Sequence, residues 1–503
     1  MPRQQMMMDV ASVVIEAPAS NRAAGARALA LPLAFTLGLG AFLFLNSVRQ
    51  NTALTWTFAS VVAVLVGWNA VLLAAARRRG RTLSVEIVLR KQHYLQACIQ
   101  GSLLVYWGWY WRQVYDSAHL IAAQLLFAYA FDMLLNWSRR DVYGLGFGPF
   151  PVVFSMNLFL WFRPDWFYFQ FLMVALGFAA KELLRWDKDG RSVHIFNPSS
   201  FPLAIFSLAL IITGSTDLTW GQDIATTLFY PPHMYLALFL FALPGQFLFG
   251  VTTMTMSAVM TTYLFGLLYY ATTGIYFFYD SYIPIAVFLG MHLLFTDPAT
   301  APRTDLGRVM FGVLYGISTV ALYALLGNLG LPTFYDKLLQ IPILNASIKL
   351  LDRLARSNAL QRIDPTAMVR LLAPRQRHVA YMAVWAVVFA AMSAVQGVGD
   401  SHPGQWLPFW QQACAEGRPN ACPYLESIMS SDCNRGSLWA CEELAILQDD
   451  SDRYRPRTLA AATAEDYPII LRGAKGPLRD VSRAGLEALA CREGWPGTCE
   501  ERR

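Results

Sequence analysis

Residues 54–76 read LTWTFASVVAVLVGWNAVLLAAA, and Arg77-Arg78-Arg79-Gly80-Arg81 follow directly. A helix needs about 20 apolar residues to cross the roughly 30 Å hydrocarbon layer of a bilayer, and no residue of this run is charged. Arginines that follow such a run are typical of the cytoplasmic side of a membrane. The stretch therefore predicts a transmembrane helix whose C-terminal end lies in the cytoplasm.

The composition extends this prediction to a polytopic membrane protein. Of 503 residues, 55% are hydrophobic and 15% are charged; soluble domains carry about 25% charged residues. These values exclude a soluble enzyme and a disordered chain. The net charge of +6 would suit a nucleic-acid-binding protein, but most basic residues lie in short loops beside apolar runs. We therefore expect no nucleic-acid partner and extensive contact with membrane lipid.

Apolar runs of suitable length recur along most of the chain, and about thirteen predict an all-α membrane fold. They lie near 27–48, 54–76, 95–112, 117–137, 146–162, 166–183, 198–214, 232–250, 252–275, 280–295, 308–328, 334–350 and 378–396. The run at 334–350 is the weakest, because it contains Asp336, Lys337 and Lys349. A re-entrant or amphipathic segment is the alternative there.

Basic residues gather on one side when the loops are numbered alternately from the N-terminus. That side receives Arg77, Arg78, Arg79, Arg81, Arg90, Lys91, Arg139, Arg140, Lys181, Arg185, Lys188, Arg191, Arg303, Arg308, Lys349, Arg353, Arg356, Arg362, Arg370, Arg375 and Arg377. The other side has little beyond Arg49, Arg112, Arg163 and Lys337. The positive-inside rule then predicts a cytoplasmic N-terminus in a bacterial inner membrane, and thirteen spans send the C-terminal tail outside.

These features divide the chain into five parts. Residues 1–26 form a cytoplasmic segment, 27–89 two transmembrane helices, and 90–355 the main transmembrane core. A basic cytoplasmic segment and the last transmembrane helix occupy 356–396. A cysteine-rich helical tail occupies 397–503.

The tail repeats the pattern C-x-[ER]-G-x4-C three times. The paired positions are Cys414 with Cys422, Cys433 with Cys441, and Cys491 with Cys499. In a helix-turn-helix the glycine permits a left-handed helix cap, and cysteines eight residues apart then come within bonding distance. The pattern predicts three local disulfides and resembles cysteine-rich relatives of Sel-like helical repeats.

A zinc site is the alternative for these cysteines. Zinc ligands are usually spaced C-x2-4-C, and the nearest histidine is His402, upstream of the first pair. We therefore favour structural disulfides and expect no metal. Disulfides persist outside the cytoplasm, which agrees with thirteen spans. Cys98 lies in an apolar run and is interpreted as a small packing residue.

Two loops on the predicted cytoplasmic side share the pattern [ND]-P-[SA]-[ST]-x-P, at 197–202 and 297–302. One interpretation is helix capping, because an Asn or Asp N-cap followed by proline commonly begins a helix. The other is that two positive helix ends face a shared anion or a phosphate-bearing cofactor. The candidate ligand residues are Lys181, Asn197, Ser199, Ser200, Asp297, Thr300, Arg303 and Arg308.

Three blocks of the core resemble the RnfD/NqrB family. They are Ala180-Lys181-Glu182, Phe196-Asn197-Pro198-Ser199, and Thr296-Asp297-Pro298-Ala299-Thr300-Ala301-Pro302 with Gly307-Arg308 and Phe311-Gly312. The segment from Asn345 to Arg353 is similar to the last conserved helix of the family. Arg90-Lys91-Gln92-His93-Tyr94 and Gly146-Phe147-Gly148-Pro149 resemble a divergent, UnbU-like branch. The resemblance covers residues 90–355.

Members of this family carry FMN esterified to a threonine in the motif D-x-x-[ST]-G-A-T. The best local match has Ala225 and Thr226 in place, but Trp220, Asp223 and Ile224 occupy the motif's Asp, Ser/Thr and Gly positions. Ile224 obstructs the close approach to the backbone that glycine would allow. We therefore do not expect covalent FMN at Thr226; a non-covalently bound flavin, FMN or riboflavin, is the cofactor that the resemblance implies.

The resemblance implies electron transport coupled to ion translocation, as a subunit of a larger membrane complex. Two alternatives stay open: a transporter or channel without redox chemistry on the same fold, and a structural or assembly subunit whose tail binds a periplasmic partner. Catalytic residues are not identified by the sequence.

Overall fold

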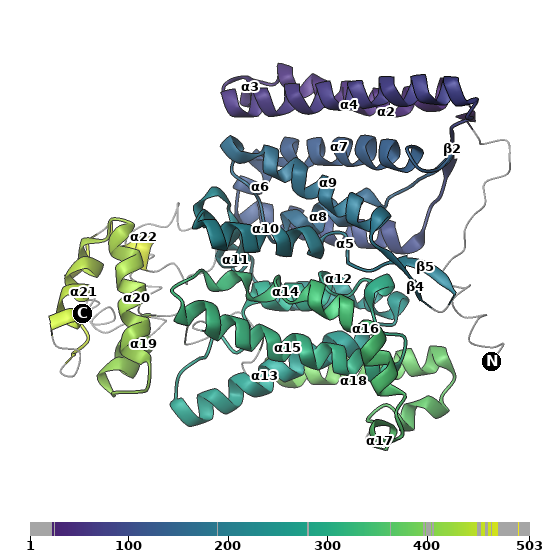
Figure 1. Cartoon of the computed structure of the whole chain (residues 1–503). Coiled ribbons are helices and arrows are strands. Elements are labelled where there is room, and N and C mark those ends of the chain that lie inside the picture. The colour runs from purple at the N-terminus through teal and green to yellow at the C-terminus, as the bar shows by residue number, and fades with distance from the viewer. Residues whose placement is uncertain are drawn as a thin grey trace. The chain divides into compact units, whose positions relative to one another are not determined.

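The computed structural model describes residues 23–24, 26–188, 190–278, 281–362, 364–395, 398, 404, 407–449, 454–457, 461–463, 465–470 and 491. The described chain is mostly helical (Figure 1). Its α-helices are α2 (Ala26–Ala41), α3 (Asn46–Arg49), α4 (Thr52–Arg79), α5 (Lys91–Tyr110), α6 (Gln113–Asp116), α7 (Ala118–Trp137), α8 (Pro149–Asn157), α9 (Tyr168–Leu183), α10 (Ser200–Thr213), α11 (Gly221–Thr227), α12 (Met234–Phe249), α13 (Thr252–Thr273), α14 (Ile285–Leu293), α15 (Asp305–Asn328), α16 (Ile341–Ala355), α17 (Asn358–Gln361), α18 (Pro374–Ala394), α19 (Leu407–Ala415), α20 (Ala421–Asn434), α21 (Leu438–Asp449) and α22 (Tyr467–Ile470).

Short strands and 3-10 turns connect these helices. The strands are β1 (Ala23–Ala24), β2 (Ser84–Ile87), β3 (Val142–Leu145), β4 (Arg185–Lys188) and β5 (Arg191–His194), and the 3-10 turns are η2 (Phe42–Phe44), η3 (Pro164–Trp166), η4 (Thr216–Leu218), η5 (Pro298–Thr300), η6 (Thr333–Lys337) and η7 (Met368–Leu371). β2 pairs with β1 in antiparallel and with β3 in parallel orientation. β4 and β5 form an antiparallel hairpin in which Arg185 faces His194.

Four helices of the described chain are long and apolar enough to cross a membrane, judged by length and composition. They are Thr52–Arg79, Ala118–Trp137, Asp305–Asn328 and Arg375–Ala394. Shorter apolar helices cover Ala30–Phe44, Ser200–Thr213 and Met234–Phe249. The prediction of about thirteen spans is therefore supported in part.

The helix α4 shows how the sequence sets helix boundaries. The Oδ1 atom of Asn51 accepts the N–H of Leu54 at 2.9 Å and caps the first turn. Gly80 ends the helix in the left-handed conformation, with φ of 62°. One face packs inward through residues such as Phe58, whereas Trp56 keeps 71% of its surface exposed. Such an exposed apolar face requires either lipid or a partner protein to cover it.

The chain divides into two compact units. Unit 1 comprises residues 1–226, 238–258 and 289–384, and unit 2 comprises 227–237, 259–288 and 385–503. The long helices of unit 1 lie side by side with their axes roughly aligned (Figure 1). Connections between them therefore gather at two ends of this unit.

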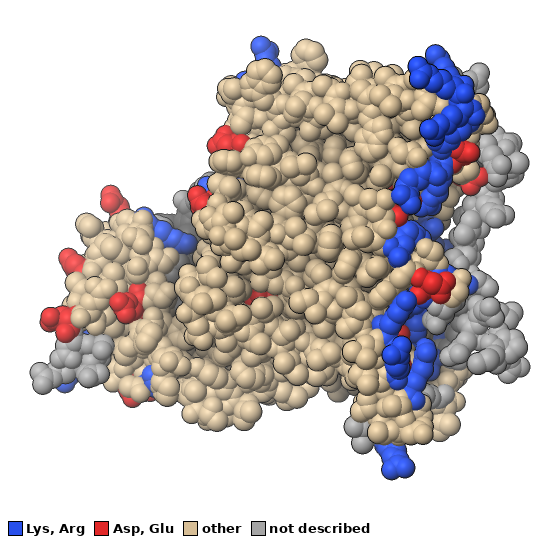
Figure 2. All heavy atoms as spheres, in the orientation of Figure 1, with Lys and Arg blue, Asp and Glu red and all other residues tan. Residues whose placement is uncertain are grey.

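Lys and Arg side chains of unit 1 gather at one of these ends (Figure 2). Contacts hold the loops of this basic end together: the Arg81 Nε atom donates to Asp141 at 2.7 Å, and Arg139 and Arg140 both pair with Glu182. Further contacts join these loops to later ones. The Lys349 ammonium group lies over the Trp186 ring, and the Lys188 ammonium group donates to the Ala301 carbonyl. Arg377 forms an ion pair with Asp305. Numbering the loops alternately from the N-terminus assigns all of these loops to one side of the predicted membrane. In the structure they contact one another at the basic end.

The opposite end of unit 1 is also joined by direct contacts. The Asn51 amide donates to Asp165 at 2.7 Å, and residues 162 and 219 form a β-bridge. The Arg163 guanidinium lies 4.2 Å from the centre of the Trp220 ring. Few basic residues take part here, as the sequence predicts.

Two helices are much shorter than the apolar runs that contain them. The run at 146–162 forms α8 over nine residues only, and the run at 280–295 forms α14, also over nine residues. Pro149 and Pro151 lie in the first turn of α8, where proline is tolerated, and Pro284 precedes α14 directly. Hydropathy cannot tell a full helix from a short helix followed by buried irregular backbone.

The doubtful run at 334–350 forms η6 and α16, which pack along α15. Near the opposite end, the Phe334 ring lies against Gly221. Midway, the Tyr315 hydroxyl donates to the Lys337 carbonyl at 3.0 Å, and at the basic end Asp352 accepts the N–H of Arg303. The segment therefore traverses unit 1 from one end to the other, although only part of it is α-helical.

In unit 2, the tail helices α19, α20 and α21 pack around a buried core that includes Trp410, Leu425, Met429 and Trp439. Disulfides join Cys414 to Cys422 and Cys433 to Cys441, as the repeated pattern predicts. After α19, the N–H groups of Gly417 and Arg418 bond back to Cys414 and Ala413, and after α20 those of Gly436 and Ser437 bond back to Cys433 and Asp432. Both glycines have positive φ, which is the expected left-handed cap.

The third predicted pair lies at the edge of the described chain. Cys491 is disulfide-bonded, and Cys499 lies outside the described residues. Cys98, on α5, is a free and exposed thiol, so its interpretation as a small packing residue is wrong: its side chain lies on the outward face of the helix.

The tail packs on the C-terminal end of α13, within unit 2. Arg418 donates to the carbonyl of Gly274 at 2.5 Å, and the Tyr424 hydroxyl donates to the carbonyl of Phe277 at 3.3 Å. Ile275 enters the core of the tail. The tail is therefore continuous with the helical part of unit 2.

Candidate functional site

The first loop of the basic end is organised by Asn197. Its Oδ1 atom accepts the N–H of Ser199 at 2.9 Å, the hydroxyl of Ser199 at 2.8 Å and the N–H of Ser200 at 3.2 Å. Its Nδ2 atom donates to the carbonyl of Leu294 at 2.9 Å, just past the end of α14. One side chain thus caps α10 and supplies a partner to the last turn of α14.

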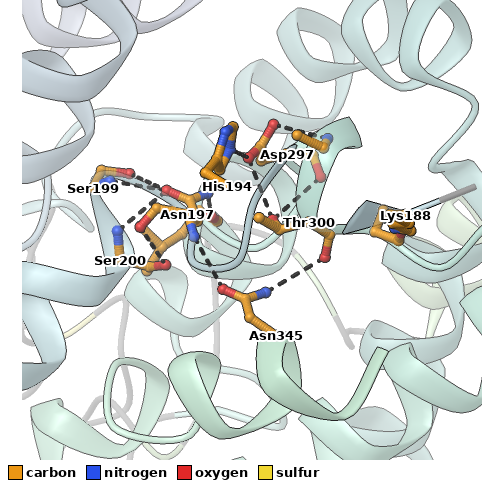
Figure 3. Close-up of polar contacts among 11 residues, drawn as sticks. Lys188, His194, Asn197, Ser199, Ser200, Asp297, Thr300 and Asn345 are labelled. Atoms are coloured by element: carbon orange, nitrogen blue, oxygen red, sulfur yellow. Dashed lines mark hydrogen bonds and ion pairs between the residues drawn. The ribbon is translucent and has the colours of Figure 1, made fainter. Parts of the chain in front are cut away.

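Asn345 on α16 joins this loop to the second one (Figure 3). Its Oδ1 atom accepts the N–H of Asn197 at 3.1 Å, and its Nδ2 atom donates to the carbonyl of Thr300 at 3.4 Å. Asn345 is completely buried. The two loops that share a sequence pattern therefore meet at one buried amide.

Asp297 organises the second loop. Its carboxylate accepts the N–H of Ala299 at 3.1 Å and lies 2.9 Å from Nε2 of His194, at the end of β5. Burial by itself would raise the pKa of this carboxyl. The hydrogen bond and charge of His194, with the N–H of Ala299 and the hydroxyl of Thr300, outweigh burial and hold the pKa below its usual value. Asp297 is therefore ionised at neutral pH.

Asp352, also on α16, anchors the start of α15. Its carboxylate accepts the N–H groups of Arg303 and Thr304 at 2.9 to 3.0 Å and the Thr304 hydroxyl at 2.9 Å. Thr304 in turn caps α15 by accepting the N–H of Gly307 at 3.1 Å. The guanidinium of Arg308 donates to the Pro302 carbonyl at 3.0 Å and lies beside Asp305.

Lys181 and His93 lie beside Gly148, at the start of α8. A side chain at Gly148 would come within 3.6 Å of the His93 ring and 4.0 Å of the Lys181 ammonium group. Burial, followed by the charges of Lys181 and Arg90, lowers the pKa of His93 to about 4. His93 is thus neutral at neutral pH. The Lys181 ammonium group forms no hydrogen bond or ion pair with the described residues, and the Phe178 ring lies 5.4 Å from its nitrogen.

The first loop also depends on a close contact with α9. A Cβ atom added to Gly177 would come within 2.3 Å of the carbonyl oxygen of Pro198. The missing side chain lets the loop backbone lie directly on the helix, which brings Asn197 within reach of α14 and α16.

No family model, no curated protein and no solved structure matches this chain.

The structure brings most of the predicted site residues into one cluster. Asn197, Ser199, Ser200, Asp297 and Thr300 share hydrogen bonds within and between the two loops. The Arg303 backbone and Arg308 belong to the adjoining start of α15. Lys181 lies apart, beside His93.

Three residues central to this cluster were missed as site residues by the sequence: His194, Asn345 and Asp352. Asn345, Ile348 and Asp352 are all buried and lie on one face of α16, at helical spacing. Buried polar residues on the inward face of an amphipathic helix are the signal that could have indicated Asn345 and Asp352. Their partners lie 40 or more positions away along the chain, so the sequence could not indicate them.

Thr226 lies elsewhere, on the short helix α11. It is exposed, and its hydroxyl donates to the carbonyls of Gln222 and Asp223, both at 3.1 Å. The neighbouring Ile224 is 1% exposed. The hydroxyl thus bonds within its own helix and lies beside a buried branched side chain.

The hydrogen-bonding capacity of the loop residues is largely used within the protein. Asn197 makes four side-chain bonds, and the Asp297 carboxylate contacts His194, Ala299 and Thr300. Capping therefore accounts for these residues better than direct ligand binding does. The cluster closes helix ends and fixes α9, α10, α14, α15 and α16 to one another at the basic end.

Proposed function

We propose that this protein is an integral membrane protein of the bacterial inner membrane that moves a small ion or solute through a core of broken helices. Its resemblance to the RnfD/NqrB family favours ion translocation coupled to electron transport, together with partner subunits. The observation that carries the proposal is the pair of short helices, α8 and α14. Nine residues span only about 14 Å, less than half of the hydrocarbon layer.

The backbone beyond α8 is irregular and buried. Residues 158–162 follow the helix with at most 3% of their surfaces exposed. Polar groups of irregular backbone have no water partner in a bilayer, so such segments occur only where protein encloses them or where they line a polar route. Discontinuous helices of this kind form the substrate and ion sites of many transporters.

Buried amides surround the end of α8. Asn157, its last residue, exchanges hydrogen bonds of 2.8 and 3.1 Å with Gln124 of α7. Gln170 of α9 donates to the same Gln124 oxygen at 3.1 Å and accepts the N–H of Phe162 at 3.1 Å. Gln100 of α5 donates to Ser155 at 2.7 Å. Five completely or almost completely buried polar side chains thus replace water around a helix that stops midway.

The end of α14 has an equivalent arrangement. The carbonyl of Leu294 accepts from Asn197, and the Thr296 hydroxyl donates to the carbonyl of His292 at 2.9 Å. Polar side chains therefore satisfy the backbone at both interruptions, as a membrane-embedded core requires.

The proposed orientation places the basic end in the cytoplasm and the tail outside. The clustering of Lys and Arg in Figure 2 and the passage of residues 333–355 along α15 support thirteen crossings. The two disulfides support an oxidising compartment for the tail.

Flux through liposomes that contain the purified chain tests the transport function. We expect sodium or proton flux down an imposed gradient, and Gln100→Leu should reduce it because it removes an amide beside α8. Asn69→Leu is the matched control, since Asn69 is a buried amide on the unbroken helix α4. Flux equal to that of protein-free liposomes would contradict the proposal.

A bound flavin would distinguish electron transport from plain transport. We expect any flavin to leave the purified protein on acid precipitation, and peptide mass spectrometry to find Thr226 unmodified. A transporter without redox chemistry is the second candidate, favoured by the internal hydrogen bonds of the Thr226 hydroxyl and the burial of Ile224. Flux without any flavin absorption would select that candidate.

A further inference from the structure

A small cavity lies in unit 1, against the last turns of α12 and α14. Its volume is about 10 Å³, close to the space that one water molecule needs. Four polar side chains line it: Gln96 of α5, Gln246 of α12, His292 of α14, and Thr296 just beyond α14. The remaining lining is apolar except for Gly245.

The side-chain amide of Gln246 has no protein partner in the described part of the chain. Gln246 is 2% exposed, and neither Nε2 nor Oε1 forms a hydrogen bond among the described residues. A buried amide without a partner is costly, and native proteins satisfy nearly all such groups with protein atoms or ordered water. Gln96, which is half-buried on α5, lines the same cavity with a second amide.

The groups that line the cavity indicate which kind of molecule can occupy it. The glutamine amides offer both donors and acceptors, and the Thr296 hydroxyl, which donates to the His292 carbonyl, can still accept a hydrogen bond. Among the described residues, no carboxylate lines the cavity to balance a positive charge. A neutral molecule of one heavy atom that both donates and accepts hydrogen bonds fits this set.

We infer that the cavity is a hydration site that holds one ordered water between α5, α12 and α14, and that this water forms a step of the translocation route. The role of this water in translocation rests on the proposed function, because it depends on transport past the interrupted helix α14. The presence of the water is inferred from the cavity and from Gln246 alone.

The variant Gln246→Leu tests whether the cavity contains water. In a dry cavity the exchange removes an unpaired buried amide, so the melting temperature of the purified protein should rise. In a hydrated cavity the water loses partners, and we expect the melting temperature to fall by several degrees. Gln124→Leu is the control, because the Gln124 amide is bonded to Asn157 and Gln170 and its loss lowers the melting temperature in either case.

A density map that resolves ordered water gives the direct readout. We expect one peak within hydrogen-bonding distance of Gln246 in the wild type and none in Gln246→Leu. A wild-type map without that peak, together with a higher melting temperature for the variant, would overturn the hydration site while leaving the proposed function intact.

Flux in liposomes tests the role of the water. Gln246→Leu should reduce flux at least severalfold, whereas Asn69→Leu should leave it unchanged. Normal flux in Gln246→Leu would overturn the role in translocation. If the wild type itself shows no flux but the water peak is present, the proposed function fails and the hydration site stands.

Discussion

A single amide, Asn197, holds two distant segments of the chain. Its four side-chain hydrogen bonds reach Ser199, Ser200 and the carbonyl of Leu294, and all of these groups are buried. We expect Asn197→Ala to reduce the free energy of unfolding by about 2 to 4 kcal/mol, because it leaves a buried carbonyl and buried N–H groups without partners. Unfolding in mixed detergent micelles measures this loss.

Asn51 provides the comparison, because it caps α4 and donates to Asp165 at a partly exposed position, where water can take the place of either bond. Asn51→Ala should cost only about 1 kcal/mol, the usual value of a cap. Equal costs for the two variants would mean that Asn197 is an ordinary cap and does not hold α14.

His93 makes stability depend on pH. Its pKa falls from 6.5 to about 4 on folding, chiefly through burial and then through Lys181 and Arg90. Between these two values the unfolded chain binds more protons than the folded one, so the contribution of His93 to stability is present above pH 6.5 and lost as the pH falls toward 4. The loss amounts to at most about 3 kcal/mol.

The variant His93→Gln should remove this part of the pH dependence. Thermal unfolding of wild type and variant at a series of pH values between 7 and 4 gives the difference between their melting temperatures. Parallel curves over the whole range would show that His93 does not carry the effect.

At the scale of elements, glycines set how closely helices approach loops and one another. Gly177 allows α9 to touch the carbonyl of Pro198, and Gly312 allows α15 to touch the carbonyl of Met254 on α13. We expect Gly177→Ala to cost about 1 to 3 kcal/mol, because the new methyl group would have to displace backbone. Detergent unfolding of the full chain measures the cost.

Gly67 on α4 is the matched control, because no atom of the described residues lies within 4 Å of the position that a Cβ atom would take there. Gly67→Ala should stabilise the protein by about 0.5 to 1 kcal/mol through helix propensity. Stabilisation by Gly177→Ala as well would mean that the loop can move away from α9 at no cost.

At the scale of the whole molecule, the number of crossings decides where the tail lies. We expect the tail cysteines to be outside the cytoplasm and oxidised. In a Cys98→Ser background, which removes the free thiol on α5, a membrane-impermeant thiol reagent should label intact cells only after reduction. Labelling confined to broken cells, without prior reduction, would place the tail inside and leave twelve crossings.

The sequence by itself determined the helical class of this protein and the local features of its tail. Apolar runs, basic loops and the repeated cysteine pattern depend on neighbours within about twenty residues, and the four long apolar helices and the two described disulfides agree with them. The reason is physical: helix length, capping glycines and eight-residue disulfide loops are local properties of the chain.

Only the tertiary structure decided how the basic end is built. Asn197 and Asn345 are 148 residues apart, and Asp297 meets His194 across 103 residues. Hydropathy did not reveal that α8 and α14 stop after nine residues, because a buried irregular segment is as apolar as a helix. The partners that make such a stop tolerable are buried amides on other helices, and folding alone brings them together.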